Sequence, residues 1–319
     1  MSVIIDFNDI YEVKDQTGAN IVSLKYGNDT IFTQERLFTI TLDPAVESAY
    51  LYIIPKGNVE PAKFYYWNGT EPNDDLSNFD GEFTASASNG IKINGGVPFR
   101  IYRKEIGPLS HSSTDYHQIQ LNANKYTVSG DLSSLTGYCT DDELQTSHFE
   151  RLFYNTNIID ARYLIIPWNK LPQACFESMF EGCNYLTSAP DLPATHCESY
   201  SYRWMFKNCY LLEKTPFIGL KTLNGEANCH QMFVNCTGLK VAIVPDIEAP
   251  VMYCFRQMFN GCTSLQYIEC LLKTPSVDYT GNWSTNLPAE GVFYKYPGTK
   301  WPTGVSGIPA GWEIKDKYM

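Results

Sequence analysis

The 319-residue chain lacks the short motifs that mark most catalytic and cofactor sites. It has no HExxH, G-x-S-x-G, P-loop or G-x-G-x-x-G pattern. Its histidines are scattered, and a Cys229–His230 nucleophile pair is disfavoured because adjacent helical residues point apart. The acidic groups 74–75 and 141–143 match no calcium loop, so we interpret them as solvated turns. We therefore expect no catalytic residue, no metal site and no cofactor, and so no enzyme.

Basic residues are also scarce. The 24 Lys and Arg stand against 35 Asp and Glu, which gives a net charge of −11. Because the acidic excess occurs in both halves, the chain should repel nucleic-acid backbones and anionic lipid. No apolar run approaches the ~18 residues of a spanning helix, and residues 1–6 lack the features of a signal peptide. We expect a protein made in the cytoplasm, with no nucleic-acid partner and no membrane insertion.

Cysteine is absent from the first 138 residues, and ten cysteines follow. No two of them are spaced as CxxC, which argues against a zinc ribbon or a thioredoxin-type site. Disulfides are an alternative, but four of the cysteines recur in a repeat as small apolar residues. The ten are Cys139, Cys175, Cys183, Cys197, Cys209, Cys229, Cys236, Cys254, Cys262 and Cys270. We expect reduced, buried thiols, on the evidence of the four that recur in the repeat, Cys183, Cys209, Cys236 and Cys262.

The repeat consists of a Met-Phe pair followed three residues later by Cys and six residues later by Leu. Its four copies place Phe at intervals of 26, 27 and 26 residues, and a degenerate fifth copy around Phe153 has Thr156 for Cys and Ile159 for Leu. A period of 26–27 lies in the range of leucine-rich repeats. We expect a repeat core made of Phe153, Met179, Phe180, Cys183, Leu186, Met205, Phe206, Cys209, Leu212, Met232, Phe233, Cys236, Leu239, Met258, Phe259, Cys262 and Leu265.

Each Met-Phe pair is predicted to end a short helical turn. In segments 175–180 and 254–259, Cys at position i and Met at i+4 would share one helical face. A Gly or Asn then falls where helices end in a left-handed residue. Proline-containing extended runs follow, as in 186–195. Because each repeat buries its face only against its neighbours, we expect stacked columns of Cys and Leu.

The motif Met-Phe-x-Gly/Asn-Cys-x-x-Leu with its proline-containing strand resembles the BspA-like leucine-rich-repeat family. Segment 126–135 is similar to the family's N-terminal cap strand, and 291–312 to its closing segment. The resemblance therefore covers about 126–319, although 213–228 and 270–285 lack the Leu-Pro-Ala-Thr run. It implies an interaction scaffold, as found on bacterial surfaces and in phages of gut Bacteroidales, and it suggests a protein of a Bacteroidales (crAss-like) bacteriophage.

The N-terminal part has a different pattern. Alternation in 37–45 and Asn-Gly turns around 91–93 predict short strands in a small Ig-like β-sandwich. The expected fold is mixed α/β and β-rich, with this sandwich followed by a BspA-type leucine-rich-repeat solenoid and a C-terminal cap. The expected domains are a candidate docking arm (1–31), the sandwich completed by 32–108, a linker (109–125), about five repeats (126–285) and the cap (286–319).

Aromatic residues offer two alternatives near the C-terminus and in the second repeat. They would stack on a glycan, or they would pack between repeats and shield the last one. The candidate binding aromatics are Tyr200, Tyr202, Tyr210, Trp283 and Trp301.

The leading functional hypothesis is a non-enzymatic virion protein: a head fibre, a capsid decoration or a tail-associated adhesion protein. Its N-terminal part would dock to the particle, and its repeats would bind another virion protein or a host surface protein or glycan. We expect a homo-oligomer, because fibres are commonly symmetric. The alternative is a bacterial cell-surface BspA-like adhesin, which would need an export signal. A polysaccharide hydrolase or lyase would need convergent carboxylates, and no pair stands out.

Overall fold

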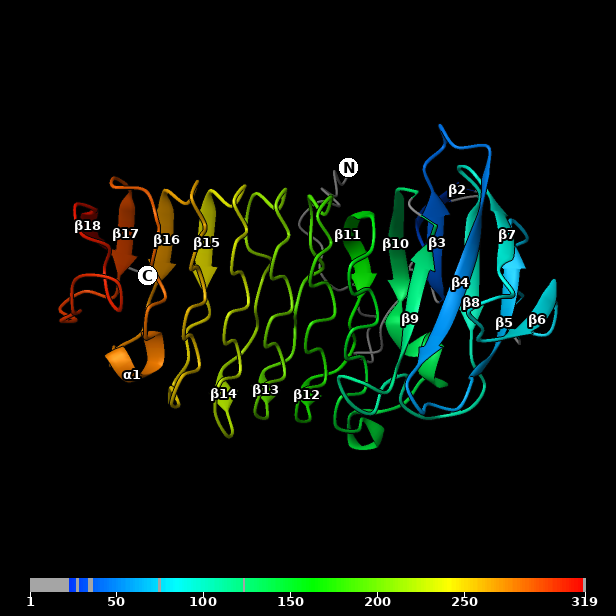
Figure 1. Cartoon of the computed structure of the whole chain (residues 1–319), viewed down its shortest axis with the longest axis horizontal. Helices are drawn as coiled ribbons and strands as arrows, with labels where there is room; N and C mark the ends of the chain where they lie inside the picture. Colours follow the sequence, from blue (N-terminus) through cyan, green and yellow to red (C-terminus); the bar gives the residue numbers. More distant parts are fainter. Residues whose placement is uncertain (1–22, 27–28, 34–36, 74–75, 123, 318–319) are drawn as a thin grey trace. The chain divides into compact units, whose positions relative to one another are not determined.

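The computed structural model describes residues 23–26, 29–33, 37–73, 76–122 and 124–317 (Figure 1). The chain divides into two compact units, 1–36 and 37–319. In the first unit, β1 (Ser23–Tyr26) and β2 (Asp29–Thr33) pair antiparallel. The remainder of the candidate docking arm lies outside the described residues.

The second unit begins with two sheets that share one hydrophobic core. A six-stranded sheet has the order β11-β10-β3-β8-β5-β6, and a three-stranded sheet has the order β7-β4-β9. All pairs are antiparallel except β10 with β11. The strands are β3 (Phe38–Leu42), β4 (Ser48–Lys56), β5 (Lys63–Asn68), β6 (Gly81–Thr84), β7 (Ile91–Asn94), β8 (Pro98–Tyr102), β9 (Tyr116–Leu121), β10 (Tyr126–Asp131) and β11 (Ile158–Ile165).

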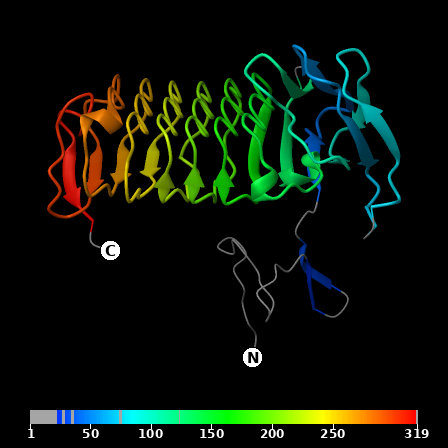
Figure 2. The same ribbon diagram turned by 90° about the horizontal axis from the view of Figure 1, so that it is seen from below.

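Five stacked coils follow, each built from a turn-rich run and an extended segment (Figures 1 and 2). We call the turn-rich segments the turn runs; they cover 147–155, 174–182, 200–208, 227–235 and 253–261. The remaining elements are the 3-10 helices η2 (Leu132–Thr136) and η3 (Asp141–Glu143), the helix α1 (Val277–Thr280), and the strands β12 (Lys170–Leu171), β13 (His196–Cys197), β14 (Thr222–Leu223), β15 (Val241–Val244), β16 (Tyr267–Cys270), β17 (Val292–Lys295) and β18 (Glu313–Asp316).

The turn runs have a four-residue period in which two residues point inward and two outward. In the third coil Met205 and Phe206 are buried, whereas the flanking pairs Arg203–Trp204 and Lys207–Asn208 are partly exposed. The second residue of each outward pair has positive φ. The fifteen positions are Ser147, Arg151, Asn155, Ala174, Ser178, Gly182, Tyr200, Trp204, Asn208, Ala227, Gln231, Asn235, Tyr253, Gln257 and Gly261.

Backbone hydrogen bonds alternate along each turn run. The amide of Phe180 donates to the carbonyl of Met205 in the next coil at 2.9 Å, while the amide of Glu181 donates to Ser178 in its own coil at 3.1 Å. Within the turn runs, the inter-coil bonds run from N–H in one coil to C=O in the next coil along the chain, whereas the extended segments bond in both directions, as from Thr187 back to Ile159. The bonds between turn runs satisfy backbone groups that a helix would bond internally, so the left-handed residues depend on the neighbouring coil.

The expected mixed α/β fold with a leucine-rich-repeat solenoid is therefore wrong. Almost all regular structure is β, in five separate sheets, and the one α-helix among the described residues has four residues. The predicted helical turns 175–180 and 254–259 are turns in which Ser178 and Gln257 have positive φ. A buried pair at i and i+4 fits a helix and a four-residue zigzag equally well, and the positive φ values prevent the helix. Within the described residues, no helix is long and apolar enough to span a bilayer.

The prediction of a separate Ig-like sandwich is also wrong, because one of its two sheets continues into the coils. The sheet that contains β3 and β8 continues through β10 into β11, which belongs to the first coil. One continuous core consequently runs from the N-terminal strands into the coils.

Segment 109–121, which includes β9, covers the first turn run. The carbonyl of His148 accepts hydrogen bonds from the amides of Leu109 and Ser110 at 3.0 and 3.1 Å, and the carbonyl of Leu152 accepts one from Ile119 at 2.8 Å. In later coils such carbonyl groups accept from the amides of the coil before. The first turn run has no coil before it, so these bonds satisfy its carbonyl groups. The stretch expected to be a linker thus contains a strand that caps the stack; the domain boundaries themselves remain predictions.

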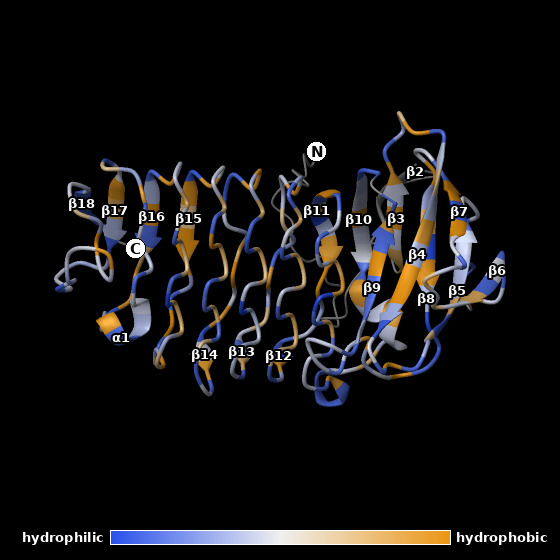
Figure 3. Ribbon diagram, viewed as in Figure 1, coloured by the Kyte–Doolittle hydropathy of each residue, from blue (hydrophilic) through white to orange (hydrophobic). Residues whose placement is uncertain are grey.

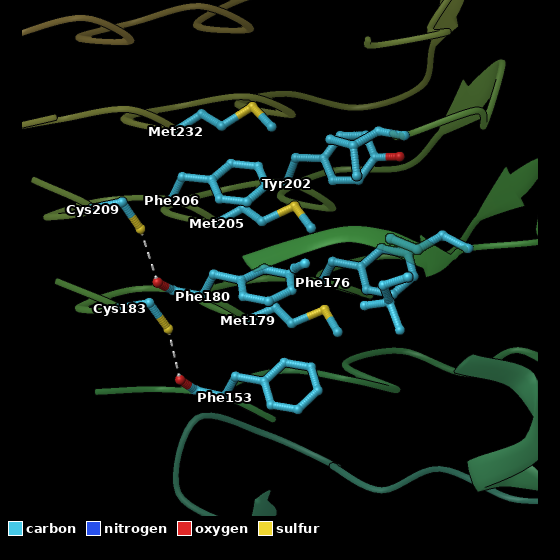
Figure 4. Packing of buried hydrophobic residues seen from close by; sticks show 14 of the residues in the cluster. Phe153, Phe176, Met179, Phe180, Cys183, Tyr202, Met205, Phe206, Cys209 and Met232 are labelled. Carbon is cyan, nitrogen blue, oxygen red and sulfur yellow. Dashed lines mark hydrogen bonds between the residues drawn. The ribbon is translucent and has the colours of Figure 1, made fainter. Parts of the chain in front are cut away.

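The stack interior consists of side-chain columns (Figure 4). The rings of Phe153, Phe180, Phe206, Phe233 and Phe259 stack with centroid distances of 5.2, 5.5, 5.5 and 6.0 Å. Beside them, each repeat thiol donates a hydrogen bond to the Phe carbonyl of the preceding coil, at 3.0–3.2 Å. Aromatic contact and thiol hydrogen bonds therefore recur once per coil.

Candidate binding faces

The outer surface of the sheet β15-β16-β17-β18 carries exposed apolar side chains. Along β15, Ala242 and Val244 point into the core, whereas Val241 is 38% exposed and Ile243 is 51% exposed. Figure 3 shows β15 as a hydrophobic strand. Parallel sheets usually have both faces covered, and nothing among the described residues covers these two side chains.

Neighbouring strands extend this surface. Val241 pairs with Tyr267 in β16, and the ring of Tyr267 lies 5.1 Å from that of Tyr294 in β17. On the other side, the backbone amide of Ile243 donates to the hydroxyl of Thr215 at 2.9 Å, two residues before Phe217, which is 58% exposed. We define the strand face by its five apolar or aromatic members: Phe217, Val241, Ile243, Tyr267 and Tyr294.

Charged pairs lie within and beside the strand face. Glu269 pairs in register with Ile243 on one side and with Tyr294 on the other, so it lies between two members of the face. Glu269, beside Tyr267, accepts hydrogen bonds from the Tyr267 hydroxyl at 2.9 Å and from Lys317. Burial and this carboxylate raise the pKa of Tyr267 to about 12, so its hydroxyl stays protonated at neutral pH. Lys240 and Glu213 form a further exposed pair at 2.7 Å. The strand face therefore combines exposed apolar and aromatic side chains with paired charges, and protein-binding surfaces have such a mixed composition.

The turn runs form a second face with a different chemistry. Its outward side chains are planar and polar: Trp204 donates to Gln231, and Gln231 donates to Gln257 at 2.6 Å, so the three join successive coils. The Arg203 guanidinium lies 4.3 Å from the centroid of Tyr200 and 4.5 Å from that of Trp204. Most polar groups here bond one another, so this face stabilises the stack.

The candidate binding aromatics separate into buried and exposed residues. Tyr202 is fully buried in the column of Phe176, and Trp283 is fully buried against Phe259. Trp301 packs on Trp283 with a centroid distance of 5.6 Å and is partly buried. Tyr200 is partly exposed, with its hydroxyl bonded to Glu226, and Tyr210 is 41% exposed. Of the five, only Tyr210 is exposed, and Tyr200 and Trp301 are half-buried.

The structure places every residue of the expected repeat core at 1% exposure or less. In the degenerate copy, however, Ile158 rather than Ile159 is fully buried, because Asp160 pairs with Ser188 and the first copy is one residue shorter. All ten cysteines are free and buried. Burial raises the pKa of Cys183 to about 11 and of Cys236 to about 12, which keeps them as thiols.

The buried ionisable groups have structural partners. His148 is fully buried; burial lowers its pKa to about 3, and its Nδ1 accepts from the amide of Gln145 at 3.1 Å. Glu150 is 3% exposed, and burial raises its pKa to about 7, with Glu177 adding a like charge. Glu177 itself pairs with Arg203 at 2.5 Å. Among the described residues, no group of three or more His, Cys, Asp or Glu could hold a metal ion.

The other acidic and histidine candidates are explained locally. Residues 141–143 form η3, where Glu143 and Thr140 make a capping box, and 74–75 lie outside the described residues. Cys229 is fully buried whereas His230 is partly exposed, so the two side chains point to opposite sides of the turn run.

Comparisons of the chain with models of known protein families, with curated proteins and with solved structures find no match. The resemblance to BspA-like proteins consequently remains a prediction that rests on the repeat motif.

Sequence inspection missed the strand face. The residues that form its centre, Val241, Ala242, Ile243 and Val244, are all apolar, so the sequence does not tell which alternate pair faces the core and which faces outward. The pairing register decides the outcome: Ala242 aligns with Ile268 in the buried column, which leaves Ile243 outside.

Proposed function

We propose that the protein is a non-enzymatic structural and adhesion protein of a bacteriophage particle. The N-terminal part attaches to the particle, and the strand face binds a protein on the host surface or another virion protein. The observation that carries the proposal is the exposed pair Val241 and Ile243 on the outside of a parallel sheet. A sheet surface of this kind is typical of protein contact sites.

The rigidity of the stack supports this role. Inter-coil backbone bonds, ring columns and thiol bonds hold the coils in register, so the strand face is preorganised. A preorganised surface loses little conformational entropy on binding.

The proposal is tested first by peptide mass spectrometry on density-purified phage particles and on washed membranes of uninfected host cells. Stoichiometric recovery from particles alone is the expected result. Recovery from the surface of uninfected cells would replace the virion assignment with a bacterial surface adhesin.

The strand face is tested with a matched pair of variants. Ile243→Glu places a charge at the centre of the face, whereas Val277→Glu places one on a side chain that is also 51% exposed but lies on α1. We expect binding of the purified protein to host cells or to partner virion proteins to fall at least tenfold for I243E and to stay unchanged for V277E. Equal binding by both variants would exclude the strand face.

A further inference from the structure

A polar cleft of about 250 Å³ opens where β9 meets the first turn run. It lies apart from the strand face and involves no member of it. Six residues line it, and none of them is charged. Four carry side-chain amides, Gln120, Asn122, Asn155 and Asn157, and the other two are Leu121 and Thr156.

The amides of this cleft have no protein partner. Across the described segments, no hydrogen bond joins the side-chain amides of Gln120, Asn122, Asn155 or Asn157 to another group. Other amides nearby do have partners, and the adjacent Gln118 donates to the carbonyl of Tyr154. The cleft therefore offers free donors and acceptors together.

The chemistry of the lining selects the ligand class. Each amide presents an N–H donor and a C=O acceptor, which suits hydroxyl groups that both donate and accept. Inside the cleft, whose lining has no charged residue, a charged ligand would lose hydration with no compensating partner; Lys125 lies outside the lining, over the ring of Tyr185. The volume is below the ~300–1,000 Å³ of pockets for drug-sized molecules, so it fits one small ring.

One exposed aromatic side chain, Tyr185, lies in the coil that follows the cleft. Asn157 and Tyr185 occupy equivalent positions in successive coils, because the next residues, Ile158 and Leu186, align through the bridge between Asp160 and Ser188. Tyr185 is 40% exposed, and Lys125 lies 4.6 Å from its ring centroid. Aromatic rings beside amides provide the apolar surface on which the C–H face of a sugar packs.

We infer that this cleft binds one neutral sugar residue, a hexose or an N-acetylhexosamine, through its four amides, with Tyr185 contacting the adjoining part of the glycan. The inference deepens the proposed adhesion function by adding a glycan site distinct from the strand face.

The test is saturation-transfer NMR on the full chain with the methyl glycosides of glucose, galactose, mannose and N-acetylglucosamine, and with glucuronic acid as the charged comparator. We expect transfer to at least one neutral sugar. That signal should fall at least fivefold in Gln120→Ala and Asn157→Ala and fall more weakly in Tyr185→Ala. Gln266→Ala, an exposed amide on another coil, is the matched control and should keep the signal.

The inference is overturned if no neutral sugar gives transfer, if the cleft variants keep the full signal, or if glucuronic acid binds more tightly than every neutral sugar. Particle recovery and the I243E comparison do not depend on this cleft. If no sugar binds but the protein is recovered from particles and I243E loses binding, the glycan site alone is refuted. If a sugar binds but the particle and I243E tests fail, the proposed virion role alone is refuted.

Discussion

The thiol of Cys236 donates a hydrogen bond to the carbonyl oxygen of Phe206, thirty residues earlier, at 3.0 Å. That carbonyl also accepts the amide of Cys209 at 3.2 Å, so one oxygen joins a bond within its coil to a bond between coils. The same arrangement recurs at Phe180 and Phe233. Cysteine suits the position because it is small, apolar and still able to donate.

Native thiols should resist alkylation. Burial raises the pKa of Cys254 to about 12, as it does for Cys236, so neither forms the reactive thiolate at pH 8. Intact-mass spectrometry after iodoacetamide treatment should show almost no adducts on folded protein and ten on protein treated in urea. Missing adducts in urea that appear only after reduction would instead indicate disulfides.

Removing one ring from the aromatic column should be costly. Phe206 stacks between Phe180 and Phe233, and Phe206→Ala should lower the free energy of unfolding by about 3–5 kcal/mol. Phe217→Ala removes the same type of side chain from the exposed strand face and should change the free energy of unfolding by at most about 0.5 kcal/mol. Urea denaturation followed by circular dichroism measures both. Similar losses would contradict the packing of the column.

At the positive-φ positions, replacing glycine by alanine should lower stability, whereas replacing alanine by glycine should not. Gly182 has φ of 76°, and a Cβ there would lie 1.9 Å from Oδ1 of Asn155, so Gly182→Ala should destabilise the protein by about 1–2 kcal/mol. Ala227 has φ of 56°, and Ala227→Gly should leave the melting temperature unchanged or raise it. Differential scanning calorimetry distinguishes the two. A lower melting temperature for A227G would show that its methyl packing outweighs the backbone strain.

The pH dependence of stability should change when Glu150 is replaced. Because burial raises the pKa of Glu150 to about 7, the folded state holds more protons than the unfolded state between pH 4.5 and 7. Stability contributed by this group is present at low pH and is lost as pH rises through that window. Glu150→Gln stays neutral, so it should gain up to about 3 kcal/mol over the parent protein between pH 4.5 and pH 8.

Denaturation midpoints at pH 4.5, 6 and 8 measure this difference. Burial also lowers the pKa of His117 and of His148, and comparing the variant with the parent protein cancels their contributions to the pH dependence. Glu213→Gln, at an exposed carboxylate, is the control and should give parallel curves. Parallel curves for E150Q would mean that folding does not raise the pKa of Glu150.

The repeat columns could be predicted because residues at equal spacing occupy equivalent places in every coil. The burial of Tyr202 follows from the same rule: it precedes Phe206 by four residues, as Phe176 precedes Phe180, and those columns are filled with buried rings. Treating Tyr202 as a binding residue ignored its position in the repeat.

The conformation of the turn runs could not be predicted from spacing. Nothing in the residue types at Trp204 or Gln231 favours positive φ, which costs energy for any side chain with a Cβ. These conformations are stabilised by bonds to the next coil, and such contacts are invisible in a local pattern. The glycan cleft was missed for a related reason, because β9 and the first turn run meet only in the folded chain.

The one-way direction of the bonds between turn runs gives this side of the stack a polarity: the first turn run has carbonyl acceptors with no earlier turn run to bond, and the end of the stack has N–H donors with no later one. The covers at the two ends differ accordingly: Leu109 and Ile119 supply N–H groups to the first turn run, whereas Val305 supplies a carbonyl to the amide of Ser284. The covers are therefore not interchangeable, but whole coils between them are. Inserting or deleting one 26–27-residue coil would change the length of the stack by about 4.8 Å and leave both junctions intact, so the number of repeats sets the distance between the two ends of the stack.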